Sequence, residues 1–282
     1  MADKYYGTPE IREMEKMMSR FMLDFSLDIT TAFNGLLDYI IGFFDPTSQP
    51  VEGWAFTKEQ TAKYHEMMYQ YFLTMDEQLK TKEWYDAWGD LFMALYAGGR
   101  KGQFFTPPSL VNMMTEGILY DLDDPTHSVP GFGKRHTISD PACGSARNLL
   151  AAHIKYMSIY DRKPFVSGED IDVQCCKMSA INMAMHGCFG EVVCHDTLCE
   201  PKSVRYGYIV NETMYPFPTN IPSIRRCNDP QKFVCTSSWE FIEKRKEQSQ
   251  ECGVSDSTPE TPHSDTVQQE TKPKQPQQLT LW

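Results

Sequence analysis

Between residues 135 and 210 the chain alternates short apolar runs with longer segments of helical periodicity, and this alternation constrains the fold more than any other feature. Strands connected by helices of this length form βαβ units, so the pattern predicts an α/β domain with a mainly parallel sheet. A fifth strand is a candidate at Phe233–Cys235. The expected strands are RHTIS (135–139), the second half of KPFVSGED (163–170), EVVCH (191–195) and YGYIV (206–210), and the expected helices are 146–160 and 173–189.

The segment SDPACGSARNLL (139–150) follows the first expected strand and opens the first expected helix. The amides of a helix N-terminus would face the crevice at the carboxyl ends of the strands. Ala142, Gly144, Ser145 and Ala146 are small enough to let a ligand approach the backbone. The full G-x-G-x-x-G pattern is absent, so the loop alone does not distinguish a ligand site from a plain strand–helix turn.

Acidic residues follow the next two expected strands. GEDID (168–172) closes the second strand, and Asp196 opens the DTL that follows the third. Asp172 suits a helix N-cap, since it stands directly before a helical segment. Asp170 and Asp196 are better interpreted as ligand-binding acids, because they continue a row of polar strand ends along one crevice.

Residues 1–99 are expected to form a helical N-terminal domain. Apolar residues recur at three- and four-residue spacing in IREMEKMMSRFMLDF (11–25), with charges on the other face. Thr57 and Gln60 form the pattern of a capping box before a second helix, and KEWYDAWGDLFMALYA (82–97) predicts a third. The α/β domain would then span residues 100–247.

Composition narrows the function classes. A net charge of −11 argues against a free-standing DNA binder that recognises the backbone alone, because Lys and Arg supply most of that affinity. The longest apolar run, GLLDYIIGFF (35–44), is too short to cross a bilayer and contains an acid. No signal peptide is evident. The nine cysteines lack zinc-site spacing, so we expect thiols in a reducing compartment, no metal and a cytoplasmic location.

The final segment, 248–282, is rich in Ser, Thr, Pro, Gln and Glu and is expected to be disordered. It ends in QLTLW, which resembles the short peptide with which bacterial replication and repair proteins engage the sliding clamp. In that interpretation the anchors are Gln278, Leu279, Leu281 and Trp282. The alternative is an unstructured end whose Leu and Trp fold back onto the domain.

Five segments in a fixed order carry a wider resemblance: GQFFTPPSLVNMM (102–114), DPACGSA (140–146), GEDID (168–172), INMAMHG (181–187) and DTL (196–198). Their order resembles the adenine-N6 DNA methyltransferases, and in particular the modification subunit of type I restriction–modification systems. The resemblance implies a Rossmann-like methyltransferase domain that binds S-adenosylmethionine (SAM).

The same resemblance implies roles for individual residues. Asp170 would hold the ribose hydroxyls of SAM, and Asp196 would hold its adenine amino group. The remaining implied cofactor residues are Phe104, Phe105, Thr106 and Pro107 at the methionine end, and Asp140, Ala142 and Gly144 in the loop beneath it.

Two departures from the family are visible. The family's Asn-Pro-Pro-aromatic motif is reduced here to Asn211 followed by Glu-Thr-Met, so a catalytic amide remains without its prolines and ring. Tyr215 or Phe217 would be a substitute ring for stacking on a flipped base. The domain is also truncated, with fewer strands than the seven of a complete methyltransferase sheet.

The leading hypothesis is therefore SAM-dependent methyl transfer to adenine N6 in DNA, with a specificity subunit or other partner. Arg100, Lys101, Arg225 and Arg226 are candidates for DNA contact, although ordinary solvated surface is the simpler interpretation. The alternative is a catalytically impaired SAM-binding or scaffold homologue that acts through partners, tethered to the sliding clamp by its C-terminus.

Overall fold

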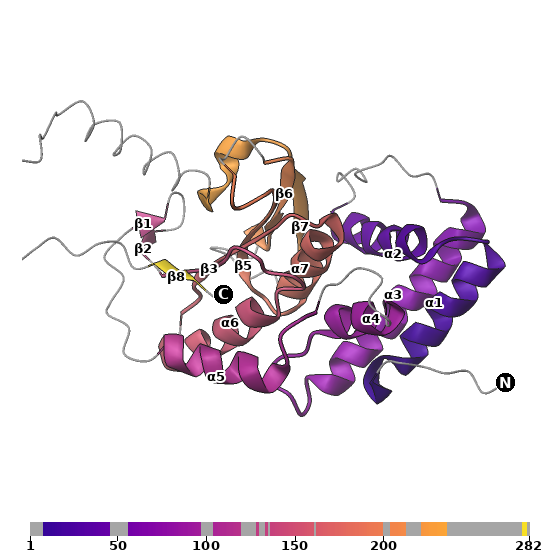
Figure 1. Cartoon of the computed structure of the whole chain (residues 1–282), viewed down its shortest axis with the longest axis horizontal. Coiled ribbons are helices and arrows are strands. Elements are labelled where there is room, and N and C mark those ends of the chain that lie inside the picture. The colour runs from indigo at the N-terminus through magenta and orange to yellow at the C-terminus, as the bar shows by residue number, and fades with distance from the viewer. Residues whose placement is uncertain are drawn as a thin grey trace, which may run out of the picture.

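The computed structural model describes residues 8–45, 56–96, 104–119, 128–129, 133–134, 136–160, 162–199, 204–212, 221–235 and 278–280. Helices and strands alternate over the central part of the chain, as the sequence predicts (Figure 1). Within these ranges, no helix is both long and apolar enough to cross a membrane.

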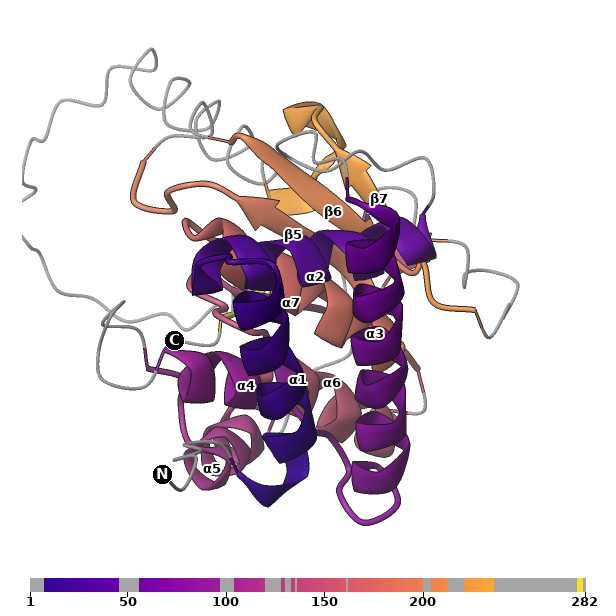
Figure 2. The ribbon, with the colours of Figure 1, turned by 90° about the vertical axis from the view of Figure 1, so that its right-hand side faces the viewer.

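The N-terminal part is helical, as expected. A short 3-10 turn, η1 (Pro9–Ile11), leads into α1 (Arg12–Asp24), and then α2 (Ile29–Phe44), α3 (Lys58–Gln78) and α4 (Ala87–Leu95) follow. The predicted capping box of α3 is present, since the side chains of Thr57 and Gln60 bond to each other's backbone N–H. Figure 2 shows α1 and α3 side by side, and these two helices pack against each other.

The helix α5 (Pro108–Ile118) was not expected from the sequence, although Pro108 at its first position is a typical start signal. After it comes a small hairpin of β1 (Ser128–Val129) and β2 (Gly133–Lys134). The main α/β unit then runs through β3 (Thr137–Asp140), α6 (Arg147–Tyr160), β4 (Phe165–Asp170), α7 (Val173–Met185) and β5 (Phe189–Cys194).

The main sheet has the strand order β7-β6-β5-β4-β3-β8, with β8 at Gln278–Thr280. The strands β8, β3, β4 and β5 run parallel to one another. The fourth expected strand, β6 (Tyr206–Val210), instead runs antiparallel to β5, and β7 (Ile224–Cys227) is antiparallel to β6. A parallel crossover needs a dozen or more residues, usually with a helix, and the 195–205 connection is too short to provide one.

The position predicted for the fifth strand is wrong. Phe233–Cys235 is not a strand, and β7 occupies that place in the order. The 3-10 turn η4 (Pro230–Lys232) carries the chain from β7 back across the sheet. Phe233 then packs against Gly207 of β6, where an added Cβ would lie 2.5 Å from its ring. This segment therefore covers one face of the sheet instead of extending its edge.

Helices α6 and α7 cover the other face. The helix α6 packs on β3 and β4, and α7 packs on β4, β5 and β6. One continuous core joins this layer to the N-terminal helices, from Ile11 to Ile224. A buried ion pair reinforces the junction, with Lys177 Nζ of α7 lying 2.8 Å from Asp38 Oδ1 of α2. The helical part and the sheet thus share their hydrophobic core, and the division at residue 99 remains a prediction.

Candidate cofactor site

The loop between β3 and α6 is held in shape by the acid that precedes it. Asp140 is fully buried, and its carboxylate accepts the Ala142 N–H at 3.0 Å and the Asn148 side-chain amide at 3.2 Å. Desolvation raises the pKa of Asp140 to about 6. Asp140 therefore positions the loop, while Ala142 at its tip is exposed.

At position 144 of this loop, any residue other than glycine would introduce strain. The φ of Gly144, +56°, lies in the left-handed region, and an added Cβ would lie 2.8 Å from the ring of Phe105. Its N–H donates to Asp170 Oδ2 at 2.9 Å, and its carbonyl accepts the Ser179 hydroxyl at 2.8 Å. The loop is consequently pinned to both β4 and α7.

Asp170, at the end of β4, links two parts of the site. One carboxylate oxygen accepts the Gly144 N–H, and the other accepts the Asp172 N–H at 2.8 Å. Burial raises the pKa of Asp170 above its usual value. Asp172 caps α7 by accepting the N–H groups of Gln174 and Cys175, which confirms its predicted role as an N-cap.

Asp196 follows β5 at the same edge of the sheet. Its partly exposed carboxylate accepts the Leu198 N–H at 3.0 Å and the Cys199 thiol at 3.3 Å. The preceding residue, His195, donates its backbone N–H to the Asp170 carbonyl at 3.0 Å, which aligns the ends of β4 and β5. The ends of β3, β4 and β5 thus carry Asp140, Asp170 and Asp196 along one edge, as the sequence predicts.

The segment 104–107 lies against this loop from the helical side. Phe105 packs between Phe92 of α4, with ring centroids 5.3 Å apart, and the guanidinium of Arg147, 5.9 Å from its ring. The Thr106 carbonyl accepts Arg147 Nη1 at 3.1 Å. Phe104 is 78% exposed, and Pro107 is the N-cap residue of α5. Of the four, Phe105 is in direct contact with Gly144, since its ring limits the space there.

A buried polar network behind the loop was missed by the sequence analysis. Asp86 Oδ2 accepts Ser145 Oγ at 2.5 Å and Arg147 Nε at 2.8 Å, and Asp86 Oδ1 accepts Asn182 Nδ2 at 2.7 Å. Arg147 also binds Asp90 at 2.9 Å. An arginine among small residues at a helix start was the available signal for this network, which ties α4 to the loop and to α7.

The structure does not bring Asn211 to this loop. Because β6 is antiparallel to β5, Val210 pairs with Gly190 near the start of β5, at the opposite edge of the sheet. Asn211 is 0% exposed, and its side chain donates to the carbonyls of Ala184 and Cys188 and accepts the Ser223 N–H. All of this amide's described contacts are structural. Tyr215 and Phe217 lie outside the described residues, as do Arg100 and Lys101.

The C-terminal peptide occupies the free side of β3. Gln278 pairs with Thr137 and Leu279 with Ile138, in parallel register (Figure 1). Three residues of the segment expected to lack regular structure therefore form the edge strand next to the cofactor loop's own strand. Leu281 and Trp282 lie outside the described residues.

Arg225 and Arg226 lie on β7, at the other end of the sheet. Arg225 forms an exposed ion pair with Glu212, with Nη2 lying 2.8 Å from Oε2. The guanidinium of Arg226 lies 4.6 Å from the centroid of the Tyr206 ring. Both side chains are thus engaged within the chain.

The family model of the N-6 DNA methylases matches residues 86–233, which is more than half of the 282 residues. A search of curated proteins found no match. The similar solved structures include two methyltransferases. A putative class I S-adenosylmethionine-dependent methyltransferase from Listeria monocytogenes has 14% identity and a TM-score of 0.41, covering 68% of this chain and 55% of that one.

The second solved structure is a type I restriction–modification methyltransferase subunit from Streptococcus thermophilus. It has 18% identity and a TM-score of 0.31, and the match covers 66% of this chain and 38% of that one. The chain thus spans about half or less of the length of these two structures. The family match begins at Asp86, the centre of the buried network, and ends at Phe233, which covers the sheet.

Proposed function

The chain belongs to the N-6 DNA methylase family, and from that premise we propose that it transfers the methyl group of SAM to the N6 amino group of adenine in DNA. The observation that carries the proposal is the shared edge of β3, β4 and β5. There the Gly144–Asp170 hydrogen bond joins the glycine loop to the end of β4, and Asp196 follows the next strand. Ligands of open α/β sheets bind at this edge.

The residues present fit SAM. Gly144 leaves free the backbone space that a Cβ would fill, the Phe105 ring borders that space, and Phe104 next to it in sequence is exposed. Asp170 would accept the ribose hydroxyls, and Asp196 would accept the adenine amino group. Phe104 and Phe105 would lie at the methionine end, with Thr106 and Pro107. The bound cofactor supplies an electrophilic methyl group, and the protein's contribution is to orient it and exclude water.

The target adenine needs acceptors for its amino hydrogens and an aromatic ring for stacking. With Asn211 at the far edge, we propose that the acceptors come from elsewhere, either from residues 213–220 with Tyr215 or Phe217, or from a partner. The acidic balance of the chain also favours a basic partner, such as a specificity subunit, for DNA binding. The cytoplasm is the expected location.

Titration calorimetry with SAM tests the cofactor site. The native protein should bind SAM, and Asp170→Ala should bind about 10–100-fold more weakly, because charged hydrogen bonds contribute roughly 1.5–3 kcal/mol. Asp172→Ser is the matched control, since serine keeps the α7 cap and should leave affinity unchanged. A folded native protein that does not bind SAM would overturn the proposal.

Methyl transfer is tested separately with labelled SAM and DNA, with and without a candidate specificity subunit. Incorporation that disappears in Asp170→Ala would support enzyme activity. SAM binding without transfer under every condition would favour the second candidate, a catalytically impaired SAM-binding homologue that works through partners. The remote and fully engaged Asn211 is the specific observation behind that second candidate.

The C-terminal QLTLW is proposed as a tether to the sliding clamp. Because Gln278–Thr280 pair with β3, clamp binding would require this strand to leave the sheet. Pull-down with purified clamp should retain the native chain and lose the 278–282 deletion. Retention that is unaffected by the deletion, or no retention of the native chain, would end the idea.

A further inference from the structure

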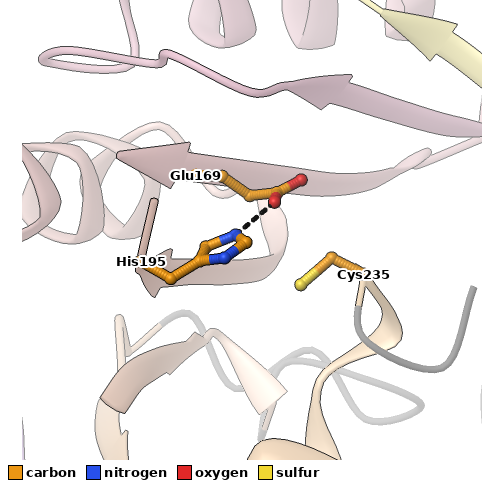
Figure 3. A group of neighbouring side chains, drawn as sticks. All are labelled: Glu169, His195 and Cys235. Atoms are coloured by element: carbon orange, nitrogen blue, oxygen red, sulfur yellow. Dashed lines mark hydrogen bonds and ion pairs between the residues drawn. The ribbon is translucent and has the colours of Figure 1, made fainter. Parts of the chain in front are cut away.

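A second polar cluster lies on the face of the sheet that α6 and α7 leave uncovered. Glu169 comes from β4, His195 follows β5, and Cys235 follows η4 (Figure 3). All three side chains are buried, and their ligand atoms lie within 4.8 Å of one another. Figure 3 shows the three side chains converging from separate segments on one point. Residues so far apart in sequence meet only because the 228–235 segment folds back over the sheet.

The cluster is supported by its surroundings. Glu191 of β5, itself buried, accepts the N–H groups of Val234 at 2.8 Å and Cys235 at 2.9 Å, which holds the turn that carries the thiol. Ser167 donates to the same carboxylate at 3.1 Å. His195 Nε2 lies 2.5 Å from Glu169 Oε2, so the imidazole and the carboxylate are hydrogen-bonded to each other. The ligand atoms are thus held close together by a packed frame.

The chemical types of the three donor atoms indicate which metal ion the cluster would bind. A thiolate, an imidazole and a carboxylate are the ligands that Zn²⁺ takes in proteins, whereas Mg²⁺ and Ca²⁺ prefer oxygen alone. With metal–ligand distances of about 2.0–2.3 Å, the donors of a tetrahedral site lie roughly 3.5 Å apart. The described donor separations, from 2.5 Å up to at most 4.8 Å, bracket that value.

We infer that Glu169, His195 and Cys235 form a three-ligand zinc site, with water or another donor in the fourth position. Binding releases the Cys235 thiol proton to solvent, the proton between His195 Nε2 and Glu169 moves to His195 Nδ1, and three metal–ligand bonds form as water leaves the ion. The oxidation state of the metal does not change. None of its three ligands is among the residues proposed to hold SAM.

The position of the site gives the metal a structural role. Glu169 and His195 directly precede Asp170 and Asp196, and the Glu169 carbonyl accepts the Cys143 N–H of the cofactor loop at 2.9 Å. A bound zinc would therefore join the ends of β4 and β5 to the 233–235 turn behind the edge that carries these acids. This role in cofactor binding rests on the proposed function, whereas zinc binding itself does not.

The test measures metal alone. The full-length chain, purified without chelators or metal-affinity resin, is assayed for zinc by mass spectrometry and titrated with Zn²⁺ against a chromophoric chelator. We expect one zinc per native chain and about 100-fold or more loss of affinity in Cys235→Ser and His195→Gln. Cys227→Ser is the matched control, because Cys227 is buried in the same small cluster and is no ligand.

Cobalt substitution provides a readout that does not depend on variants that fold. The native chain loaded with Co²⁺ should show a near-ultraviolet thiolate charge-transfer band, which Cys235→Ser removes and Cys227→Ser keeps. A native chain that is folded by circular dichroism but binds no zinc would overturn the site. So would zinc binding that survives loss of Cys235 and His195. None of these measurements uses SAM or DNA, so their failure is distinct from failure of the proposed function.

Discussion

The carboxyl and amino ends of β3, β4 and β5 form two opposite edges of the central sheet. The polar side chains at these two edges differ in their roles. At the carboxyl ends of β3, β4 and β5, the loop around Gly144 is tied to the strands, yet Ala142 and Phe104 are exposed and Asp196 is partly exposed. At the opposite edge, the side-chain amide of Asn211 donates hydrogen bonds to two backbone carbonyls and accepts one from a backbone N–H. A polar residue near a strand end is therefore not enough for function. It must also retain hydrogen-bonding capacity that faces outward.

The difference between the edges comes from strand direction. The helix α7 carries the chain back so that β5 runs parallel to β4, and their ends coincide. No helix is described between β5 and β6, so β6 returns antiparallel and its end falls at the other edge. The edge at the carboxyl ends of β3, β4 and β5 is called the open edge below, and the edge that holds Asn211 is called the closed edge. The following predictions distinguish the two edges, beginning with the largest expected effect.

Replacing Arg147 should destabilise the buried polar network that supports the open edge. Arg147→Ala leaves Asp86 and Asp90 without their buried cation, which we expect to cost about 3–5 kcal/mol of stability in urea unfolding. Lys80→Ala, which breaks an exposed ion pair, is the control and should change stability little. Equal effects of the two variants would contradict a structural role for the network.

The buried carboxylate of Asp140 should make stability depend on pH. Its folded pKa, near 6, exceeds the usual 3.8, so the folded chain binds the proton more tightly than the unfolded chain. Its contribution is therefore complete below pH 3.8 and is lost as pH rises to 6, by roughly 2–3 kcal/mol. Urea unfolding from pH 4 to 7 measures this, and Asp140→Asn should flatten that part of the profile. An unchanged profile in the variant would assign the dependence to other groups.

Replacing Gly144 should remove SAM binding at the open edge. Gly144→Ala combines a left-handed backbone with a methyl group against the Phe105 ring, and we expect a stability loss of about 1–3 kcal/mol. SAM affinity by calorimetry should fall with it. Gly117→Ala, on α5 with nothing within 4 Å of its added Cβ, should instead be neutral or gain about 0.5–1 kcal/mol. A Gly144→Ala chain with native SAM affinity would contradict the proposal that SAM lies close to the Gly144 backbone.

Truncation of Asn211 should affect stability and leave cofactor binding intact. Asn211→Ala removes the donor to the buried Cys188 carbonyl and the acceptor of the half-buried Ser223 N–H, at a cost of about 1–3 kcal/mol. SAM affinity measured by calorimetry should remain native. A loss of SAM affinity in a stably folded variant would show that the two edges are coupled, and would reopen a role for Asn211 at the cofactor site.

Several features were predictable because local chemistry determines them. The capping box at Thr57 and the N-cap at Asp172 formed as expected, since each needs only neighbouring backbone N–H groups. The row of Asp140, Asp170 and Asp196 was also predictable, because helical crossovers of ordinary length place successive parallel strands in register. Asp140 nevertheless turned out to be buried inside the loop.

Other features required contacts between distant parts of the chain. The Asp86–Arg147 pair joins residues from different domains of the sequence interpretation, and no local pattern indicated it. The direction of β6 depended on the connection after β5, whose described residues contain no crossover helix, and that direction placed Asn211 at the opposite edge. The pairing of β8 with β3 adds Gln278–Thr280 to the sheet as an edge strand, across more than a hundred residues of sequence.

The sequence by itself determined that this chain builds an α/β unit with a glycine-containing loop and acids at successive strand ends, because hydrophobic periodicity and turn chemistry act over short distances. Only the tertiary structure decided which polar residues remain accessible, since burial depends on what packs against each strand end. The same physical reason brings Glu169, His195 and Cys235 together. Three residues with no meaningful spacing in the sequence become neighbours when the segment after β7 folds across the sheet.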